Sequence, residues 1–157
     1  MHAYQIWKDL GPELNHEILD SACTENKKLY KQLLEEVSKA LRVRPQKLLE
    51  ASRKERHDRF HDLLGRPDFG ILSQNLLMNW LDKSQRAMLV AFLDKLNLKH
   101  DGKGYVDEFP PTMDDVLLKK AVEHLYNTFE KEKVSTYLKT FDSIAACNWP
   151  LVEQLVH

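Results

Sequence analysis

Apolar residues recur every three or four positions along almost the whole chain, and this spacing is the feature that most constrains its fold. Within residues 27–41, for example, Leu29, Leu33 and Val37 fall on one side of a helix. Glycine and proline, which interrupt helices, supply only 5 and 6 of the 157 residues. Outside residues 99–111, no segment alternates polar and apolar residues over the length of a strand. We therefore expect an all-α protein of about seven to nine helices packed as antiparallel helical hairpins.

Several residues mark where these helices begin and end. Those expected at helix starts are Pro12, Asn26, Pro45, Ser84 and Thr112, and Gly65 is expected to end a helix. The segment FGILSQNLLMNWL, residues 69–81, is apolar around much of its surface, which predicts deep burial. Residues 99–111, KHDGKGYVDEFPP, hold two glycines and two prolines and predict an irregular loop. No long stretch rich in Ser, Gly or Pro separates the helices, so we predict one domain over residues 1–157.

The composition and charge of the chain bear on its cellular compartment and on the partners it can have. The formal net charge is -1 at pH 7, so no overall field directs it to nucleic acid or membrane. No run of 18 apolar residues is present, and the first residues do not form a signal peptide. The two cysteines form no CxxC pair, which favours a reducing compartment over a disulfide framework. We expect a cytoplasmic protein with no membrane partner.

Two histidines four residues apart, His57 and His61, are the best candidates for a metal site. This spacing places both imidazoles on one side of a helix, and Asp58 and Asp62 could add oxygen ligands. No third ligand is evident nearby in the sequence. The alternative is a pair of histidines at the edge of the apolar face, packed beside Phe60. A metal-dependent enzyme using the two histidines therefore stays a hypothesis.

Two further motifs resemble metal sites but break the pattern that the metal needs. In HEILD, residues 16–20, an aspartate replaces the second histidine of the zinc motif HExxH, and we expect His16 and Asp20 to face solvent. In the 99–111 loop, a calcium-binding register would place Lys99, Lys103 and Pro110 where oxygen ligands are required. Neither motif predicts a bound cation, and no cofactor motif is present.

The segment from residue 39 to residue 66 is basic, with nine Lys or Arg against four Asp or Glu. Such an imbalance can mark a surface that binds phosphates or an acidic partner. The candidate binding residues are Arg42, Arg44, Arg53, Lys54, Arg56 and Arg59. On a helical wheel the last four surround their helix, and Phe60 is the only aromatic residue among them, so a solvated helix is the alternative.

An internal similarity and the absence of catalytic motifs bear on the function class. Residues 76–96 resemble residues 125–144 at a separation of 48 positions, although any two amphipathic hairpins align to a similar degree. Stacked helical hairpins commonly bind macromolecules along a surface.

Phosphate-binding and nucleophile motifs such as GxxxxGK[ST] and GxSxG are absent. We therefore favour an interaction or adaptor module over an enzyme, with a protein partner or self-association, and nucleic-acid binding through the basic segment as the alternative.

Overall fold

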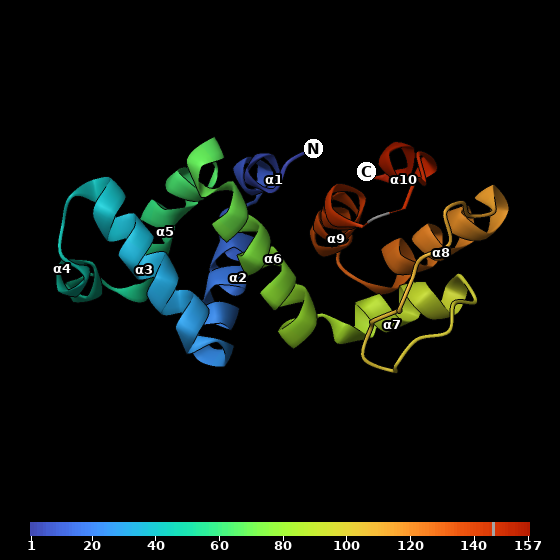
Figure 1. Ribbon diagram of the computed structural model, residues 1–157, viewed down its shortest axis with the longest axis horizontal. Coiled ribbons are helices and arrows are strands. Elements are labelled where there is room, and N and C mark those ends of the chain that lie inside the picture. Colours follow the sequence, from blue (N-terminus) through green and yellow to red (C-terminus); the bar gives the residue numbers. More distant parts are fainter. Residues whose placement is uncertain (146) are drawn as a thin grey trace. The chain divides into compact units, whose positions relative to one another are not determined.

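The chain folds into helices, most of them joined by short connections, with one long irregular loop between α7 and α8 (Figure 1). The computed structural model describes residues 1–145 and 147–157. This part of the chain contains ten α-helices, one 3₁₀-helix and no strand, which confirms the all-α prediction, and none of its helices is long and apolar enough to cross a membrane. The elements are α1 (Ala3–Asp9), α2 (Pro12–Glu25), α3 (Lys27–Leu41), α4 (Pro45–Glu50), α5 (Arg53–Leu64), η1 (Pro67–Phe69), α6 (Gly70–Ser84), α7 (Arg86–Lys95), α8 (Asp115–Thr128), α9 (Lys131–Ile144) and α10 (Leu151–Leu155). Helix α1 has no counterpart among the expected helices, and the packing as antiparallel hairpins stays a prediction.

The chain divides into two compact units. The N-terminal unit is His2–Lys83, and the C-terminal unit is Ser84–His157 together with Met1. Compact units within one chain can still unfold as one cooperative structure. The division therefore leaves the single domain over residues 1–157 as a prediction.

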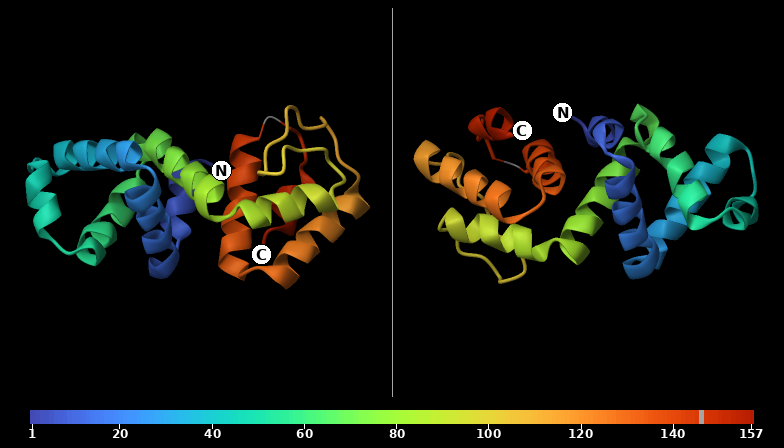
Figure 2. Two further views of the ribbon diagram at one scale, coloured as in Figure 1. Left: turned by 90° about the horizontal axis from the view of Figure 1, so that it is seen from below. Right: turned by 180° about the vertical axis from the view of Figure 1, so that it is seen from behind.

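In the N-terminal unit, α2 packs against α3 and α5, and α1 packs against α5 (Figure 2). The tryptophans Trp7 and Trp80 belong to the core of this unit, because both are fully buried. The indole Nε1 of Trp7 donates to the backbone oxygen of Ser73 at 3.1 Å, and the Ser73 hydroxyl donates to the backbone oxygen of Leu64 at 2.7 Å. These two bonds connect α1, α6 and α5 through polar groups that burial would otherwise leave unpaired.

In the C-terminal unit, α7 packs against α8, and α10 packs against both α8 and α9. Residues 99–111 form no helix or strand, as predicted. The Phe109 ring lies edge-on to Phe141, with 5.2 Å between ring centroids, and to Trp149, at 5.7 Å. The indole Nε1 of Trp149 donates to the backbone oxygen of Pro110 at 2.9 Å. Aromatic packing and this bond therefore hold the end of the irregular loop against the helices.

Most of the expected helix boundaries are confirmed, and two are wrong. Pro12 and Pro45 begin helices, Asn26 accepts a hydrogen bond from the backbone N–H of Leu29 at 3.2 Å, and Gly65 follows the last residue of α5. Ser84 instead ends α6, because the N-cap position of α7 is Gln85. Thr112 lies too early to cap α8. The Asp114 carboxylate caps this helix by accepting from the backbone N–H of Leu117 at 2.9 Å.

Candidate functional site

A chain of polar side chains lies inside the N-terminal unit, where α2, α3 and α5 meet. His57 of α5 is fully buried. Its Nε2 lies 2.8 Å from the hydroxyl of Tyr30 on α3, and its Nδ1 lies 3.3 Å from Oδ1 of Asp20 on α2. Arg56 donates from Nε to the Tyr30 hydroxyl at 3.1 Å and from a terminal nitrogen to the backbone oxygen of Ala51 at 3.1 Å. We call Asp20, Tyr30, Arg56 and His57 the His57 network.

The donors and acceptors of the His57 network can be assigned in order. A guanidinium only donates, so the Tyr30 oxygen accepts from Arg56. The single hydroxyl proton of Tyr30 then bonds to Nε2 of His57, which places the imidazole proton on Nδ1, facing Asp20. The 3.3 Å contact between Nδ1 and Oδ1 is poorly aligned for a hydrogen bond, and neither atom has a hydrogen-bond partner among the described residues.

Burial keeps His57 and Tyr30, two members of this network, uncharged at neutral pH. Burial, and then the nearby Arg56 cation, lower the pKa of His57 to about 3. Burial raises the pKa of Tyr30 above its ordinary value, although the Arg56 hydrogen bond acts in the opposite direction. At neutral pH the imidazole of His57 and the phenol of Tyr30 are therefore neutral, and they lie between the side chains of Arg56 and Asp20. This arrangement is suited to holding three helices together.

His16 and Asp20 both contact α5. The expectation that they face solvent is wrong for His16, whose side chain is 20% exposed, and holds in part for Asp20, whose side chain is 44% exposed. The Nε2 atom of His16 lies 2.8 Å from Oδ1 of Asp58, and the His16 and His57 ring centroids are 5.8 Å apart. Asp20 contacts His57 and also lies 3.8 Å from a terminal nitrogen of Arg53. Both residues lie off the apolar stripe of α2, but α5 also packs against this helix.

The metal site predicted at His57 and His61 gains no support from this geometry. Both ring nitrogens of His57 face protein groups, Tyr30 and Asp20, so neither nitrogen is open to an ion. The Nδ1 of His61 lies 3.8 Å from Asp62, and its Nε2 is buried without a hydrogen-bond partner among the described residues. Across the described part of the chain, no group of three or more His, Cys, Asp or Glu side chains is placed to hold a metal ion.

The basic residues of the 39–66 segment separate into different environments. Arg56 is buried in the His57 network, so its assignment to a binding surface is wrong: its guanidinium satisfies internal acceptors. Arg53 is exposed and lies beside Asp20. The exposed Lys54 and Arg59 project from different sides of α5, five residues apart. Two further exposed arginines, Arg42 and Arg44, lie in the connection between α3 and α4. The segment therefore presents no continuous basic stripe.

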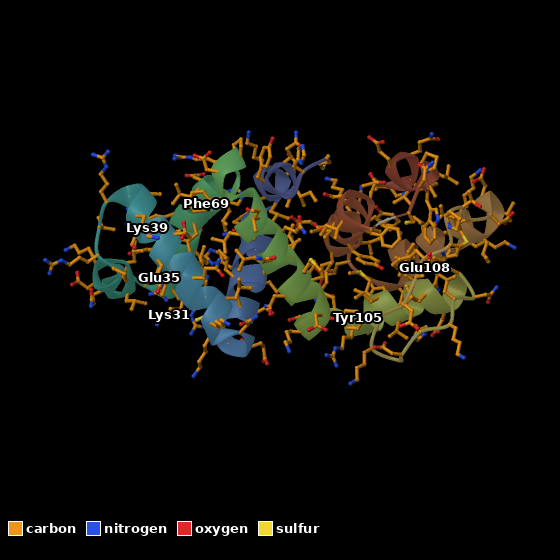
Figure 3. The ribbon with its side chains drawn as sticks, in the orientation of Figure 1. Lys31, Glu35, Lys39, Phe69, Tyr105 and Glu108 are labelled. Carbon is orange, nitrogen blue, oxygen red and sulfur yellow. The ribbon has the colours of Figure 1, made fainter. Side chains whose placement is uncertain are left out.

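A groove lies between α3 and the start of α6, and we call it the α3–α6 groove. Its volume is about 490 Å³. Ile71, on its rim, is 80% exposed, whereas the neighbouring Phe69 and Leu72 are buried. Figure 3 shows Phe69 close to the part of α3 that carries Lys39. The groove is lined by Gln32, Glu36, Lys39 and Ala40 of α3, by Asp68 and Phe69 of η1, and by Ile71 and Leu72 of α6.

Two apolar residues of α6 point away from the protein, so the expected deep burial of residues 69–81 is wrong in part. Ile71 is 80% exposed and Met78 is 44% exposed. These residues are seven positions apart and so lie on nearly the same side of the helix. Their exposure could not be read from the sequence, because the segment is apolar on several sides. Tyr30 was also missed as a site residue, although a phenol on an apolar helix face commonly requires a buried hydrogen-bond partner.

The irregular loop of the C-terminal unit uses its polar groups internally. Oδ1 of Asp101 accepts from the backbone N–H groups of Lys103, at 2.8 Å, and Tyr105, at 3.1 Å. The first of these bonds is the main cause of the lowered pKa of Asp101. His100 bonds to Asp94 at 2.6 Å and accepts from the backbone N–H of Gly102 at 2.9 Å. Figure 3 shows Tyr105 and Glu108 on the same loop. These bonds join polar groups of the loop to one another and to α7.

No protein-family model, no curated protein sequence and no solved structure matches this chain. The functional argument therefore rests on the residues and contacts described above.

Proposed function

We propose that this protein is a protein-interaction module that binds through the α3–α6 groove. The observation that carries the proposal is Ile71, an aliphatic side chain that is 80% exposed on the rim of a groove of about 490 Å³. A single exposed apolar residue needs no explanation, but an apolar rim beside a concave surface is typical of protein contacts. Met78, seven residues further along α6, is also exposed, at 44%, although it does not line the groove.

Three features support a protein partner over nucleic acid. The groove pairs the apolar Ile71 with two charged residues of α3, Glu36 and Lys39, and a mixture of apolar and charged residues is typical of an interface core and its rim. Among the described residues that line the groove, Lys39 is the only Lys or Arg of the basic segment. The other exposed basic residues of the segment are spread over the α3–α4 connection, α4, α5 and the residues just after α5. Surfaces that bind single-stranded nucleic acid need a continuous positive track with stacking aromatic side chains. We also propose a cytoplasmic location, because the two cysteines form no CxxC pair and this favours a reducing compartment.

Affinity capture from native lysate tests the proposal, with nuclease-treated and untreated samples and three baits. The baits are the wild type, Ile71→Asp and the control Val116→Asp, which changes a 60% exposed valine in the C-terminal unit. We expect a stoichiometric protein that survives nuclease, is retained by Val116→Asp and is lost with Ile71→Asp. Material lost on nuclease treatment would instead favour nucleic-acid binding. A partner retained equally by all three baits would exclude the groove.

A further inference from the structure

The N-terminal part of α5, residues 53–59, is attached to its neighbours mainly through polar contacts. Only Arg56 and His57 in this range are buried, whereas the rest of the same helix buries three apolar side chains. The buried pair contacts Asp20 of α2 and Tyr30 of α3. A helix segment that buries no apolar side chain lacks the main source of stability for helix packing. The attachment of residues 53–59 to α2 and α3 therefore depends on the His57 network.

A proton added to His57 would break the order of hydrogen bonds in this network. In the neutral state the Tyr30 hydroxyl accepts from Arg56 and donates to Nε2 of His57. A protonated imidazole donates from both ring nitrogens, so Nε2 could no longer accept. Arg56 and His57 would then both direct N–H groups at the Tyr30 oxygen, and the Tyr30 proton would lose its acceptor. A buried polar group without a partner destabilises the packed arrangement.

The charges around His57 also oppose its protonation. Charged and titratable side chains face it from three helices: His16 and Asp20 of α2, Tyr30 of α3, and Arg53, Arg56 and Asp58 of α5. Asp58 already pairs with His16 at 2.8 Å, and Asp20, whose side chain is 44% exposed, also lies 3.8 Å from Arg53. Among the described residues, α1, α4 and η1 form no hydrogen bond or ion pair with the His57 side chain. A second positive charge beside the Arg56 guanidinium would therefore be only partly compensated.

We infer that the His57 network is a pH-sensitive switch, in which protonation of His57 separates residues 53–59 from α2 and α3 while the rest of the N-terminal unit stays folded. The end of α5 remains attached in the open state because Phe60 and Leu64 are fully buried. In addition, the Ser73 hydroxyl of α6 donates to the backbone oxygen of Leu64 at 2.7 Å. Opening is therefore confined to the part of α5 that polar contacts hold.

The open state would present a cationic segment that neutral pH conceals. Arg56 and His57 are buried in the closed state, whereas Arg53 and Lys54 are already exposed. Separation brings all four side chains to the surface together, with His57 in its charged form. No residue that lines the α3–α6 groove belongs to the His57 network, so the switch does not depend on the proposed function.

Hydrogen exchange of the full-length chain tests the switch, with rates corrected for the pH dependence of exchange in unfolded peptides. Burial and Arg56 lower the pKa of His57 to about 3 in the closed state, whereas an exposed histidine titrates at about 6.5. Between these values the open state binds the proton and the closed state does not, so acid favours opening. Protection of the amides of residues 56–59 should fall by about 25-fold between pH 7 and pH 5. Equal protection at the two pH values would overturn the inference.

Urea separates local opening from complete unfolding. Local opening exposes little surface, so exchange at residues 56–59 should change little in low urea. Exchange at residues 72–80 of α6 should be slower than at residues 56–59 and should rise with urea, because these amides become accessible only when the core unfolds. Equal protection of the two segments at pH 5 would show that the whole unit opens, and the local switch would be wrong.

Two variants identify the titrating residue. His57→Gln removes the buried imidazole and should abolish the fall in protection between pH 7 and pH 5. The matched control His16→Gln/His61→Gln removes the other two histidines of α2 and α5 and should keep the fall at about 25-fold. A fall that persists in His57→Gln, or that disappears in the control, would overturn the role of His57. The control retains His57, so it decides the question even where His57→Gln does not fold.

Discussion

At the scale of single residues, the Tyr30 hydroxyl is the group on which the His57 network depends. It accepts from Arg56 and bonds to His57, so Tyr30→Phe leaves two buried polar nitrogens without this partner. We expect the free energy of unfolding to fall by about 1–3 kcal/mol. Tyr137→Phe is the matched control: Tyr137 is 5% exposed, and its hydroxyl bonds to none of the other described residues. Urea unfolding should show a change below about 0.5 kcal/mol for Tyr137→Phe, and equal losses in the two variants would contradict the role of the network.

The pKa of His57 makes a second prediction at this scale. Burial and Arg56 lower that pKa to about 3, whereas an unfolded histidine titrates near 6.5. Between these values the unfolded chain binds the proton and the folded chain does not, so the free energy of unfolding falls as the pH is lowered. Protonation of His57 in the unfolded chain should therefore lower the free energy of unfolding by about 2 kcal/mol between pH 7 and pH 5.

The measurement for His57 is urea unfolding of the wild type and His57→Gln at both pH values. Other titrating groups are shared by the two proteins, so their contributions cancel in the difference. His57→Gln should be less stable at pH 7 but should lack the additional loss at pH 5. The same loss in both proteins would show that His57 does not titrate in this way.

At the scale of helices, two residues, Asp114 and Thr112, are candidates for the N-cap of α8. Asp114 accepts the backbone N–H of Leu117, while Thr112 is exposed two residues earlier. Asp114→Ala should therefore reduce the free energy of unfolding by about 1 kcal/mol, and Thr112→Ala should change it by less than about 0.5 kcal/mol. Asp114→Asn keeps an acceptor and should retain most of the stability. Thermal unfolding of the three variants tests the assignment, and a larger loss for Thr112→Ala would reverse it.

The helices were predictable because periodicity and capping are local properties of the sequence. Asn26 and Gly65 mark boundaries through bonds or conformations of the nearby backbone. The candidate site was less predictable, because its members are brought together by packing between helices. His57 lies at the edge of the apolar face of its own helix, and only the neighbouring α2 and α3 make that position interior. Ile71 shows the reverse case: its helix is apolar on several sides, and the absence of a neighbour on one side leaves it exposed.

At the scale of the whole molecule, the two compact units differ in how their cores are closed. In the N-terminal unit, hydrogen bonds run from Trp7 to Ser73 and from Trp80 to Glu17, so residues far apart in the sequence close one core. The C-terminal unit closes its own aromatic core around Phe141. Because a chain of about 80 residues can bury some 60% of its extended surface, the N-terminal unit is large enough to fold alone.

We therefore expect a fragment containing residues 2–83 to fold without the rest of the chain. The fragment should show helical circular dichroism and a cooperative urea transition, because all the partners of the His57 network lie within it. The comparison is Tyr30→Phe in the fragment and in the full chain. The same loss of stability in both would show that the N-terminal unit folds independently, and the prediction of a single domain over residues 1–157 would then be wrong. A fragment with little helix would show that the core needs residues 84–157, as a single domain requires.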